Sequence, residues 1–416
     1  MLMNTIGRFN AVQLAQEIKE SFNIIYCAND FYKYEWGYYK KWHEQEIFKC
    51  IKNLIEQDFT SHKVEEIIKC LKSESYIDTS KLNNSLYLNI QNGLFDTNNF
   101  ELIRHAPDVL STTQLQVIYN ADTTCPKWLK TLDEIFEGDQ EKIKLLQEFF
   151  GLCLTNETKF EKALFLLGDG ANGKSVILFI LQRLLGDDNF SAIPLEKFNN
   201  HHYLANLFSK LANIAIETSV SSSVYDSTFK AIVSGDPITA DAKFKPPFVF
   251  RPYCKLIFAL NNMPRVDDKT SAFFRRLLIL RFSKIFQEEE QNKNLKFELL
   301  KEINGIFVWS LNGLKSLKER GYFKIPSEME AEIDDYKKDN NNVLLFVEDQ
   351  CEFDVTFQIS KDELYSFYSN WCKTNNYLPC AKKKFGKELK KAYPKLDEAR
   401  EALKRLWRGI RKIPLL

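Results

Sequence analysis

The sequence predicts an α/β core preceded by a small mixed module and followed by a second small domain. Between residues 160 and 285, apolar runs of strand length alternate with helical runs, as expected for a buried parallel sheet covered by helices. The chain has 416 residues, which is more than one hydrophobic core usually holds. Its composition is 44% hydrophobic and 27% charged, which is typical of globular proteins.

Changes of pattern along the chain predict four segments. We expect an N-terminal module over residues 1–80, a β-rich connector over 81–136, the α/β core over 137–335 and a C-terminal domain over 340–416. The connector should contain strands at Leu86–Ile90, Gly93–Phe95 and Leu115–Tyr119, separated by turn residues. After the core strands, a charged helix is expected between Phe282 and Leu300.

The N-terminal module is rich in aromatic residues that alternate with charged ones. Tyr32, Tyr34 and Trp36 follow a strand-like alternation that ends at Gly37, which predicts a hairpin. Nearby lysines would allow these rings to stack on nucleic-acid bases. The alternative is a half-buried sheet covered by helices, and we favour it.

One motif indicates nucleotide binding. Residues 168–175 read GDGANGKS and fit the phosphate-binding loop G-x-x-x-x-G-K-[ST]. The loop follows an apolar strand, Ala163–Leu167, and precedes an apolar helix. Backbone N–H groups of such a loop point at phosphate oxygens, while Lys174 reaches the β- and γ-phosphates and Ser175 holds Mg²⁺. The nucleotide-binding residues are therefore predicted to be Gly168, Asp169, Gly170, Ala171, Asn172, Gly173, Lys174 and Ser175.

Hydrolysis needs further groups, and the chain offers them in order. Glu217 ends an apolar strand, where a carboxylate can polarise the attacking water and contact the metal. Asn261 ends the next apolar strand, where its amide can sense the γ-phosphate. Arg275 and Arg276 precede a third strand and suit a finger that stabilises developing charge.

Two stretches are candidates for binding nucleic acid. Residues 234–250 predict a hairpin on which Lys243 and Lys245 share one face and Phe244 lies on the other. The lysines could bind phosphates while Phe244 contacts bases. The alternative is an edge hairpin whose lysines are solvated. Residues 382–412 contain 13 Lys or Arg and 4 Asp or Glu residues, a net charge of +9. This cluster favours nucleic acid over a solvated basic helix.

Overall charge and cysteine content place limits on the cellular setting. The formal net charge is only +1, so any nucleic-acid surface must be local. Nine cysteines occur without a C-x-x-C pair, which favours reduced thiols in the cytoplasm over disulfides or zinc. The first residues lack the pattern of a signal peptide, and no apolar run is long enough to span a membrane. We expect a cytoplasmic protein, in the host cytoplasm if it is viral.

The ordered motifs resemble those of a known family. The segments GDGANGKS, IAIETS, FKAIVSGDPITADAKFKPPFVF, KLIFALNNMP and FFRRLLILRF are similar to superfamily 3 helicases. Within that superfamily they look like the phage and plasmid primase-helicase group related to the poxvirus primase-helicase. The likeness extends over roughly residues 80 to 416 and, more weakly, to the first 80 residues.

The resemblance implies an AAA+ type P-loop core, a helicase-associated N-terminal module and a winged-helix-like C-terminal domain. It also implies a homohexameric ring that hydrolyses ATP with Mg²⁺ between subunits while it moves along single-stranded DNA. By resemblance, Lys174 and Ser175 are Walker A residues, Glu217 is Walker B and Asn261 is the sensor. The resemblance also favours Arg276 over Arg275 as the finger and implies that the hairpin with Lys243, Phe244 and Lys245 contacts DNA. Many relatives carry two adjacent Walker B acids, whereas Thr218 follows Glu217 here, so the second acid is unassigned.

The expected function is that of an ATP-dependent replicative DNA helicase. One alternative is a DNA-stimulated ATPase that acts as a loader or initiator without processive unwinding. Another is a ring-shaped scaffold, which the combination of Glu217, Asn261 and the arginine pair disfavours. Too few residues precede the helicase region to form the primase of many relatives. We therefore expect a fragment of a longer phage primase-polymerase, or a helicase that acts with such a module in trans.

Overall fold

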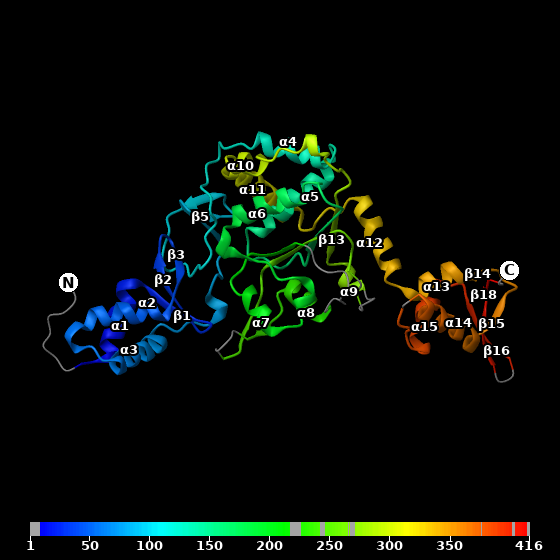
Figure 1. Ribbon diagram of the computed structural model, residues 1–416, viewed down its shortest axis with the longest axis horizontal. Helices are drawn as coiled ribbons and strands as arrows, with labels where there is room; N and C mark the ends of the chain where they lie inside the picture. The colour runs from blue at the N-terminus through cyan, green and yellow to red at the C-terminus, as the bar shows by residue number, and fades with distance from the viewer. Residues whose placement is uncertain are drawn as a thin grey trace. The chain divides into compact units, whose positions relative to one another are not determined.

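The chain forms two compact units in the computed structural model, which describes residues 9–216, 226–241, 246–264, 266, 271–375, 377–401 and 404–413. The first unit combines Met1–Pro264 with Arg275–Met329, and the second combines Arg265–Phe274 with Glu330–Leu416 (Figure 1). Across the described ranges, we find no helix with the length and apolarity needed to cross a bilayer.

The N-terminal part of the first unit is a three-stranded antiparallel sheet with three helices. Its elements are α1 (Ala11–Phe22), β1 (Ile24–Cys27), β2 (Asp30–Glu35), β3 (Tyr38–Trp42), α2 (Glu44–Ile55) and α3 (Ser61–Glu74). The predicted hairpin is confirmed, because β2 pairs with β3 around a turn at Trp36 and Gly37. Phe31, Tyr32 and Tyr39 are buried, as the half-buried sheet requires.

The connector sheet is only partly as predicted. Its strands are β4 (Tyr87–Ile90), β5 (Gly93–Asp96) and β6 (Glu101–Ile103), in the order β4-β5-β6. The prediction of a third strand at Leu115–Tyr119 was wrong, because that segment makes only a single bridge from Leu115 to Ile90. Beyond this bridge the backbone bonds to side chains instead of to β4, because Ile118 N–H donates to Asn304 Oδ1 over 2.9 Å and Tyr119 N–H donates to Asn92 Oδ1 over 3.1 Å.

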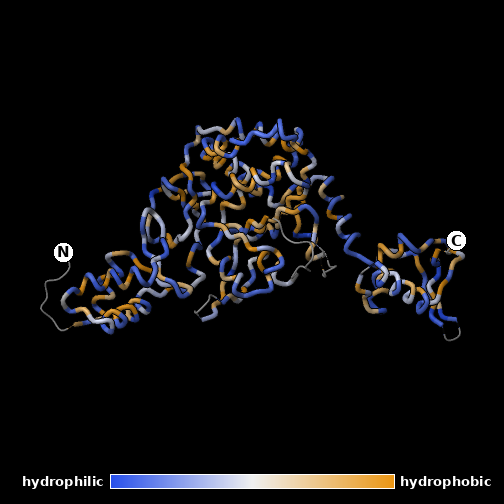
Figure 2. The backbone as a smooth tube through the Cα atoms, in the orientation of Figure 1, coloured by the Kyte–Doolittle hydropathy of each residue, from blue (hydrophilic) through white to orange (hydrophobic). Residues whose placement is uncertain are grey.

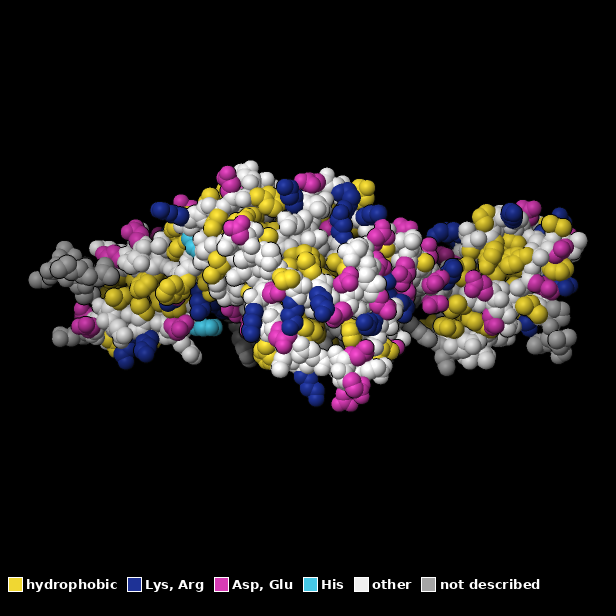
Figure 3. All heavy atoms as spheres, turned by 90° about the horizontal axis from the view of Figure 1, so that it is seen from above, with side chains coloured by type: hydrophobic (Ala, Val, Ile, Leu, Met, Phe, Trp, Pro, Cys, Tyr) yellow, Lys and Arg dark blue, Asp and Glu magenta, His cyan; other side chains and the backbone are white. Residues whose placement is uncertain are grey.

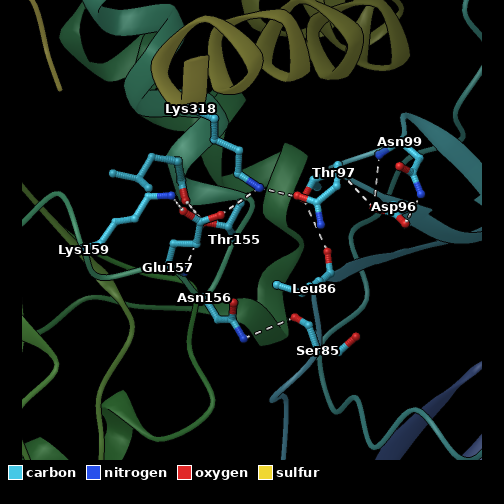
Figure 4. Close-up of polar contacts among 12 residues, drawn as sticks. Ser85, Leu86, Asp96, Thr97, Asn99, Thr155, Asn156, Glu157, Lys159 and Lys318 are labelled. Atoms are coloured by element: carbon cyan, nitrogen blue, oxygen red, sulfur yellow. Dashed lines mark hydrogen bonds and ion pairs between the residues drawn. The ribbon is translucent and has the colours of Figure 1, made fainter. Parts of the chain in front are cut away.

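Polar contacts attach the connector sheet to the core. Lys318 donates to Thr97 Oγ1 over 2.8 Å and pairs with Glu157 over 2.8 Å, so it links the connector to the loop before β7 (Figure 4). Asn156 donates to the carbonyl of Ser85 over 3.4 Å. Together these contacts hold β4 and β5 against the core.

The core is a five-stranded parallel sheet in the order β13-β7-β12-β9-β8. The strands are β7 (Ala163–Leu167), β8 (Phe190–Ser191), β9 (Ala212–Ile216), β12 (Lys255–Leu260) and β13 (Leu277–Arg281). All residues of β7 and β12 are buried, as expected for central strands covered on both faces. The hydropathy colouring of Figure 2 shows these hydrophobic strands at the centre of the first unit. The expected α/β core is therefore present.

Helices cover both faces of this sheet. Figure 1 shows α5, α6 and α11 on one side and α7 and α8 on the other. The helices of the core are α4 (Pro126–Ile135), α5 (Gln140–Cys153), α6 (Lys174–Leu185), α7 (His201–Leu204), α8 (Asp226–Ser234), α10 (Leu295–Leu300) and α11 (Ile303–Arg320). The prediction of a helix from Phe282 to Leu300 was wrong, because only its last six residues are helical. On the face drawn in Figure 3, basic and acidic side chains are interspersed over this unit.

The second unit has its own core, formed by residues such as Phe346, Tyr368 and Trp407. It contains antiparallel strand pairs and a three-stranded sheet in the order β15-β17-β16. Its elements are α9 (Ser271–Phe274), most of α12 (Ser327–Asp339), α13 (Asn342–Gln350), β14 (Cys351–Glu352), β15 (Gln358–Ser360), α14 (Lys361–Thr374), α15 (Lys382–Ala392), β16 (Asp397–Glu401), β17 (Lys404–Arg408) and β18 (Arg411–Lys412).

Candidate functional site

The loop between β7 and α6 is sterically suited to cradle a phosphate chain. Gly173 has φ +88°, and a Cβ there would lie 2.6 Å from Ile135 Cδ1 of α4. Gly168 has φ +153°, and a Cβ there would lie 2.6 Å from the carbonyl oxygen of Phe282. Only glycine tolerates both the backbone angles and the close neighbours. Gly168 and Gly173 are therefore needed to form the loop.

Lys174, the first residue of α6, turns back into this loop. Its Nζ donates to the carbonyl oxygens of Gly168 and Asp169, the second over 2.9 Å, and to Asn172 Oδ1 over 3.2 Å. Burial lowers the pKa of the Lys174 ammonium, and the nearby Asp169 carboxylate opposes that shift. An ammonium held by neutral carbonyl and amide oxygens can exchange these partners for phosphate oxygens at little cost.

The register of the parallel sheet brings Asn261 to the loop. Leu260 pairs with Leu167, and Gly168 N–H donates to the Leu260 carbonyl over 3.2 Å. The residue after each strand, Asn261 and Gly168, therefore lies at the same carboxyl edge of the sheet. β9 ends at this edge too, because Ile216 pairs with Ala259. Glu217 follows Ile216 but lies outside the described residues.

A cavity of about 560 Å³ opens at this edge, within the size range of small-molecule sites. It brings together the predicted residues Lys174, Ser175 and Asn261. The cavity lining also includes Gly170, Ala171, Asn172, Gly173, Ile135, Leu178, Phe286, Gln291, Asn292 and Leu295.

The cavity walls outside the loop come from segments that the sequence analysis did not assign to the site. Ile135 belongs to α4, and Gln291 belongs to the stretch that was predicted to be helical. Phe286 N–H donates to the Ala171 carbonyl over 2.8 Å, which fixes this stretch against the loop. No local sequence signal predicts such contacts, because they join segments that lie far apart in the chain.

The residues present fit a magnesium ion that arrives with a nucleotide. Mg²⁺ keeps several waters and binds mainly through substrate phosphates and one or two protein oxygens. The Ser175 side chain lines the cavity beside Lys174 and supplies one such oxygen. Over the described ranges, no group of three His, Cys, Asp or Glu residues gathers as a metal cluster.

The predicted arginine pair lies at the opposite end of the core strands, where β7 begins. The Arg276 carbonyl accepts from Ala163 N–H over 2.8 Å at the start of β7, whereas the loop follows the end of β7. At about 3.3 Å per residue, the length of β7 alone separates them by about 13 Å. Neither arginine therefore shares the cavity with Lys174 and Asn261 of its own chain.

The two arginines have different environments. The Arg276 side chain is only 8% exposed, and its Nη2 pairs with Glu161 over 2.9 Å and donates to Ser234 Oγ over 2.7 Å. The Arg275 side chain is 64% exposed and lies 3.4 Å from the same carboxylate. Arg276 is held inside its own chain, while Arg275 faces solvent.

The structure describes the paired strands at the base of the hairpin that was predicted to contact DNA. β10 (Ile238–Ala240) pairs antiparallel with β11 (Phe248–Phe250). His202 Nδ1 lies 2.9 Å from the Asp241 carbonyl, and Asn29 donates to the Pro246 carbonyl over 3.3 Å, so both ends of the loop are anchored. Lys243, Phe244 and Lys245 lie between these anchors and outside the described residues.

Three protein families match separate parts of the chain. Residues 11–137 match a family described as D5 N terminal like, and residues 338–409 match one described as Poxvirus D5 protein-like. Residues 166–276, from β7 to Arg276, match DUF5906, a family of unknown function.

A relative and two solved structures extend this picture. The chain is 25% identical over 263 residues to the protein named Putative helicase L207/L206 of Acanthamoeba polyphaga mimivirus, covering 61% of this chain and 27% of that protein. The chain thus spans about a quarter of that relative's length. Two apo structures of the NrS-1 C-terminal region share its fold with TM-scores of 0.58 and 0.55, at 10% identity and 97% coverage of this chain and 99% of theirs.

Proposed function

We propose that this chain is an ATP-dependent DNA helicase. Its terminal segments match the two D5 families, in line with the expected primase-helicase group, and its viral relative is named as a helicase. In this proposal it moves along single-stranded DNA as a homohexameric ring during viral, phage or plasmid replication. Its core is an AAA+ P-loop domain of superfamily 3, and its second unit is winged-helix-like. The cavity that unites Lys174, Ser175 and Asn261 is the observation that carries the proposal.

In the proposed reaction, each residue of the cavity has one task. Lys174 leaves the loop carbonyls and binds the β- and γ-phosphates, and Asn261 donates its amide to the γ-phosphate or the attacking water. Glu217, one residue beyond β9, orients and polarises that water. Mg²⁺, when bound with ATP, neutralises charge on the phosphates. Positioning and electrostatic stabilisation then supply most of the rate enhancement.

The arginine of the proposed reaction comes from a neighbouring copy. Both arginines of a chain lie at the sheet edge away from its own cavity, so neither serves its own nucleotide. We assign the role to Arg275, since its exposed guanidinium can reach another subunit without breaking a buried pair. Arg276 then supports it by holding Glu161 and the start of β13 in place.

Single-stranded DNA is the proposed track, and the β10–β11 hairpin is its contact. Lys243 and Lys245 would bind phosphates and Phe244 would stack on or wedge between bases. A primase or polymerase module, in cis or in trans, is the proposed partner, and the host cytoplasm is the proposed compartment for a viral protein.

The test compares ATP hydrolysis and strand displacement by the wild-type chain and by Lys174→Ala. We expect turnover to fall by about a hundredfold or more, because the lysine stabilises charge on the transferred phosphate. Lys69→Ala, on the exposed surface of α3, is the matched control and should change neither activity. Undiminished hydrolysis by Lys174→Ala would refute the site. DNA-stimulated hydrolysis without strand displacement would identify a loader or initiator instead.

A further inference from the structure

The second unit contains a basic cleft of its own, which we call the α15 cleft. It has a volume of about 820 Å³ and lies between α15, the first turn of α14 and the strands β16 and β17. Its lining is dominated by Lys361, Lys382, Lys383, Lys387, Lys390, Lys391 and Arg405. The only acids among its lining residues are Asp362 and Glu398. The cleft is thus a concave surface with a strong excess of positive charge.

Three lysines of α15 form one stripe along the cleft. Lys383, Lys387 and Lys391 are spaced four residues apart, so their side chains lie on the same face of the helix. Like charges at this spacing destabilise a helix. Within the described part of the chain, none of the three makes an ion pair or side-chain hydrogen bond. Arg405 of β17 adds a further cation to the same cleft.

Two other lysines of the cleft are already paired with acids. Lys361 pairs with Glu398 over 2.6 Å, and its Nζ lies 4.0 Å from the centre of the Trp407 ring. Lys382 pairs with Asp362. Both acids of the lining are therefore engaged by these two lysines, and the stripe is left with its charge available to a ligand.

The aromatic rings at the cleft are not available for stacking. Phe385 and Trp407 are each 1% exposed and belong to the hydrophobic core of the unit. Single-stranded nucleic acids are usually bound by basic grooves with exposed aromatic rings on which bases stack. The α15 cleft has the charge without the stacking surface, which favours a ligand that presents phosphates and keeps its bases paired.

We propose that the α15 cleft binds the phosphate backbone of duplex DNA. From Lys383 to Lys391 the helix rises about 12 Å, which matches the rise of three to four phosphates along one strand of a duplex. Lys383, Lys387 and Lys391 each neutralise a phosphate, and Arg405 adds a contact from the opposite wall. Contacts to phosphates carry no base information, so binding is independent of sequence. No residue of the ATP cavity takes part, and this binding goes beyond the proposed helicase reaction.

The experiment measures binding of the full chain, without ATP, to a fluorescent DNA duplex of about two helical turns over a range of salt concentrations. The test variant is Lys383→Gln with Lys387→Gln and Lys391→Gln. Loss of three phosphate contacts should weaken binding about tenfold or more and make the slope of log affinity against log salt shallower by about 2.7. The matched control is Lys337→Gln with Lys338→Gln and Lys373→Gln, which removes the same charge from exposed lysines of α12 and α14 outside the cleft. It should bind nearly as the wild type does.

Two further variants keep the result decisive. The variant Lys383→Arg with Lys387→Arg and Lys391→Arg preserves the charge and should bind the duplex nearly as the wild type does. Lys174→Ala should bind the duplex normally without ATP, so failure of the helicase proposal leaves this test intact. Duplex binding by the glutamine variant equal to that of the control would overturn the proposal. A loss confined to single-stranded DNA, to an RNA duplex or to an acidic protein would overturn it as well.

Discussion

The neighbouring side chains of Arg275 and Arg276 should have separable effects on stability and on hydrolysis. Arg276→Gln removes an ion pair to Glu161 at 2.9 Å and a hydrogen bond to Ser234 at 2.7 Å, from a side chain that is 8% exposed. Breaking a fully buried pair costs about 3–5 kcal/mol. Glu161 is 38% exposed and regains water, so the expected loss of unfolding free energy is about 2–3 kcal/mol.

Arg275→Gln should behave differently. Its side chain is 64% exposed and its distance to Glu161 is 3.4 Å, so the pair contributes at most about 0.5 kcal/mol. If Arg275 stabilises the transition state of a neighbouring subunit, its loss should reduce ATP turnover about a thousandfold while nucleotide binding persists. The ATP turnover per molecule of the wild-type chain should also rise with protein concentration, because each cavity needs an arginine from a second copy of the chain.

The assays are thermal unfolding and ATP turnover at several protein concentrations. We expect Arg276→Gln to lower the unfolding temperature by about 5 °C or more and Arg275→Gln to leave it nearly unchanged. Normal turnover by Arg275→Gln, together with an inactive but equally stable Arg276→Gln, would refute the assignment of roles. Turnover per molecule that does not depend on concentration would refute the shared site.

Two further predictions concern the loop and the core. Gly173→Ala should lower the unfolding free energy by about 1–2 kcal/mol, because φ at this position is +88°, and should weaken binding of a fluorescent ATP analogue. Gly170→Ala is the control and should bind the analogue normally, because no atom lies within 4 Å of the added Cβ. Equal binding by both variants would contradict the role of Gly173. Arg320→Leu leaves the 2% exposed carboxylate of Glu148 without its two-pronged partner and should lower the unfolding free energy by about 3–5 kcal/mol in urea titrations. The added change Glu148→Leu should recover much of that loss, and failure to do so would count against a buried charge as its cause.

The glycine-rich loop at residues 168–175 could be predicted from the sequence because the residues that determine it are adjacent in the chain. A buried strand, glycines with special backbone angles and the start of a helix follow one another from Ala163 to Lys174. The strand ending at Leu260 could also be predicted from its apolar run, and parallel pairing then places Asn261 beside the loop. These features depend on steric rules that act over a few residues.

Elements chosen by competition between distant segments were harder to predict. The stretch after Phe282 is charged like an exposed helix, yet its backbone bonds to Ala171 and it lines the cavity instead. The Leu115–Tyr119 run has the pattern of a strand, but after one bridge to β4 its backbone bonds to the side chain of Asn304 in α11. In both cases local propensity was outweighed by a tertiary contact.

The sequence by itself determined the phosphate loop, the apolar core strands and the concentration of basic charge near the C-terminus. Only the tertiary structure decided that Arg276 is buried against Glu161 while Arg275 faces solvent, and that three lysines of α15 share one cleft. The sequence specifies backbone angles and the positions of strands along the chain, since these depend on neighbouring residues. Exposure and ion pairing depend on which distant side chains arrive at the same place, and that is set by packing.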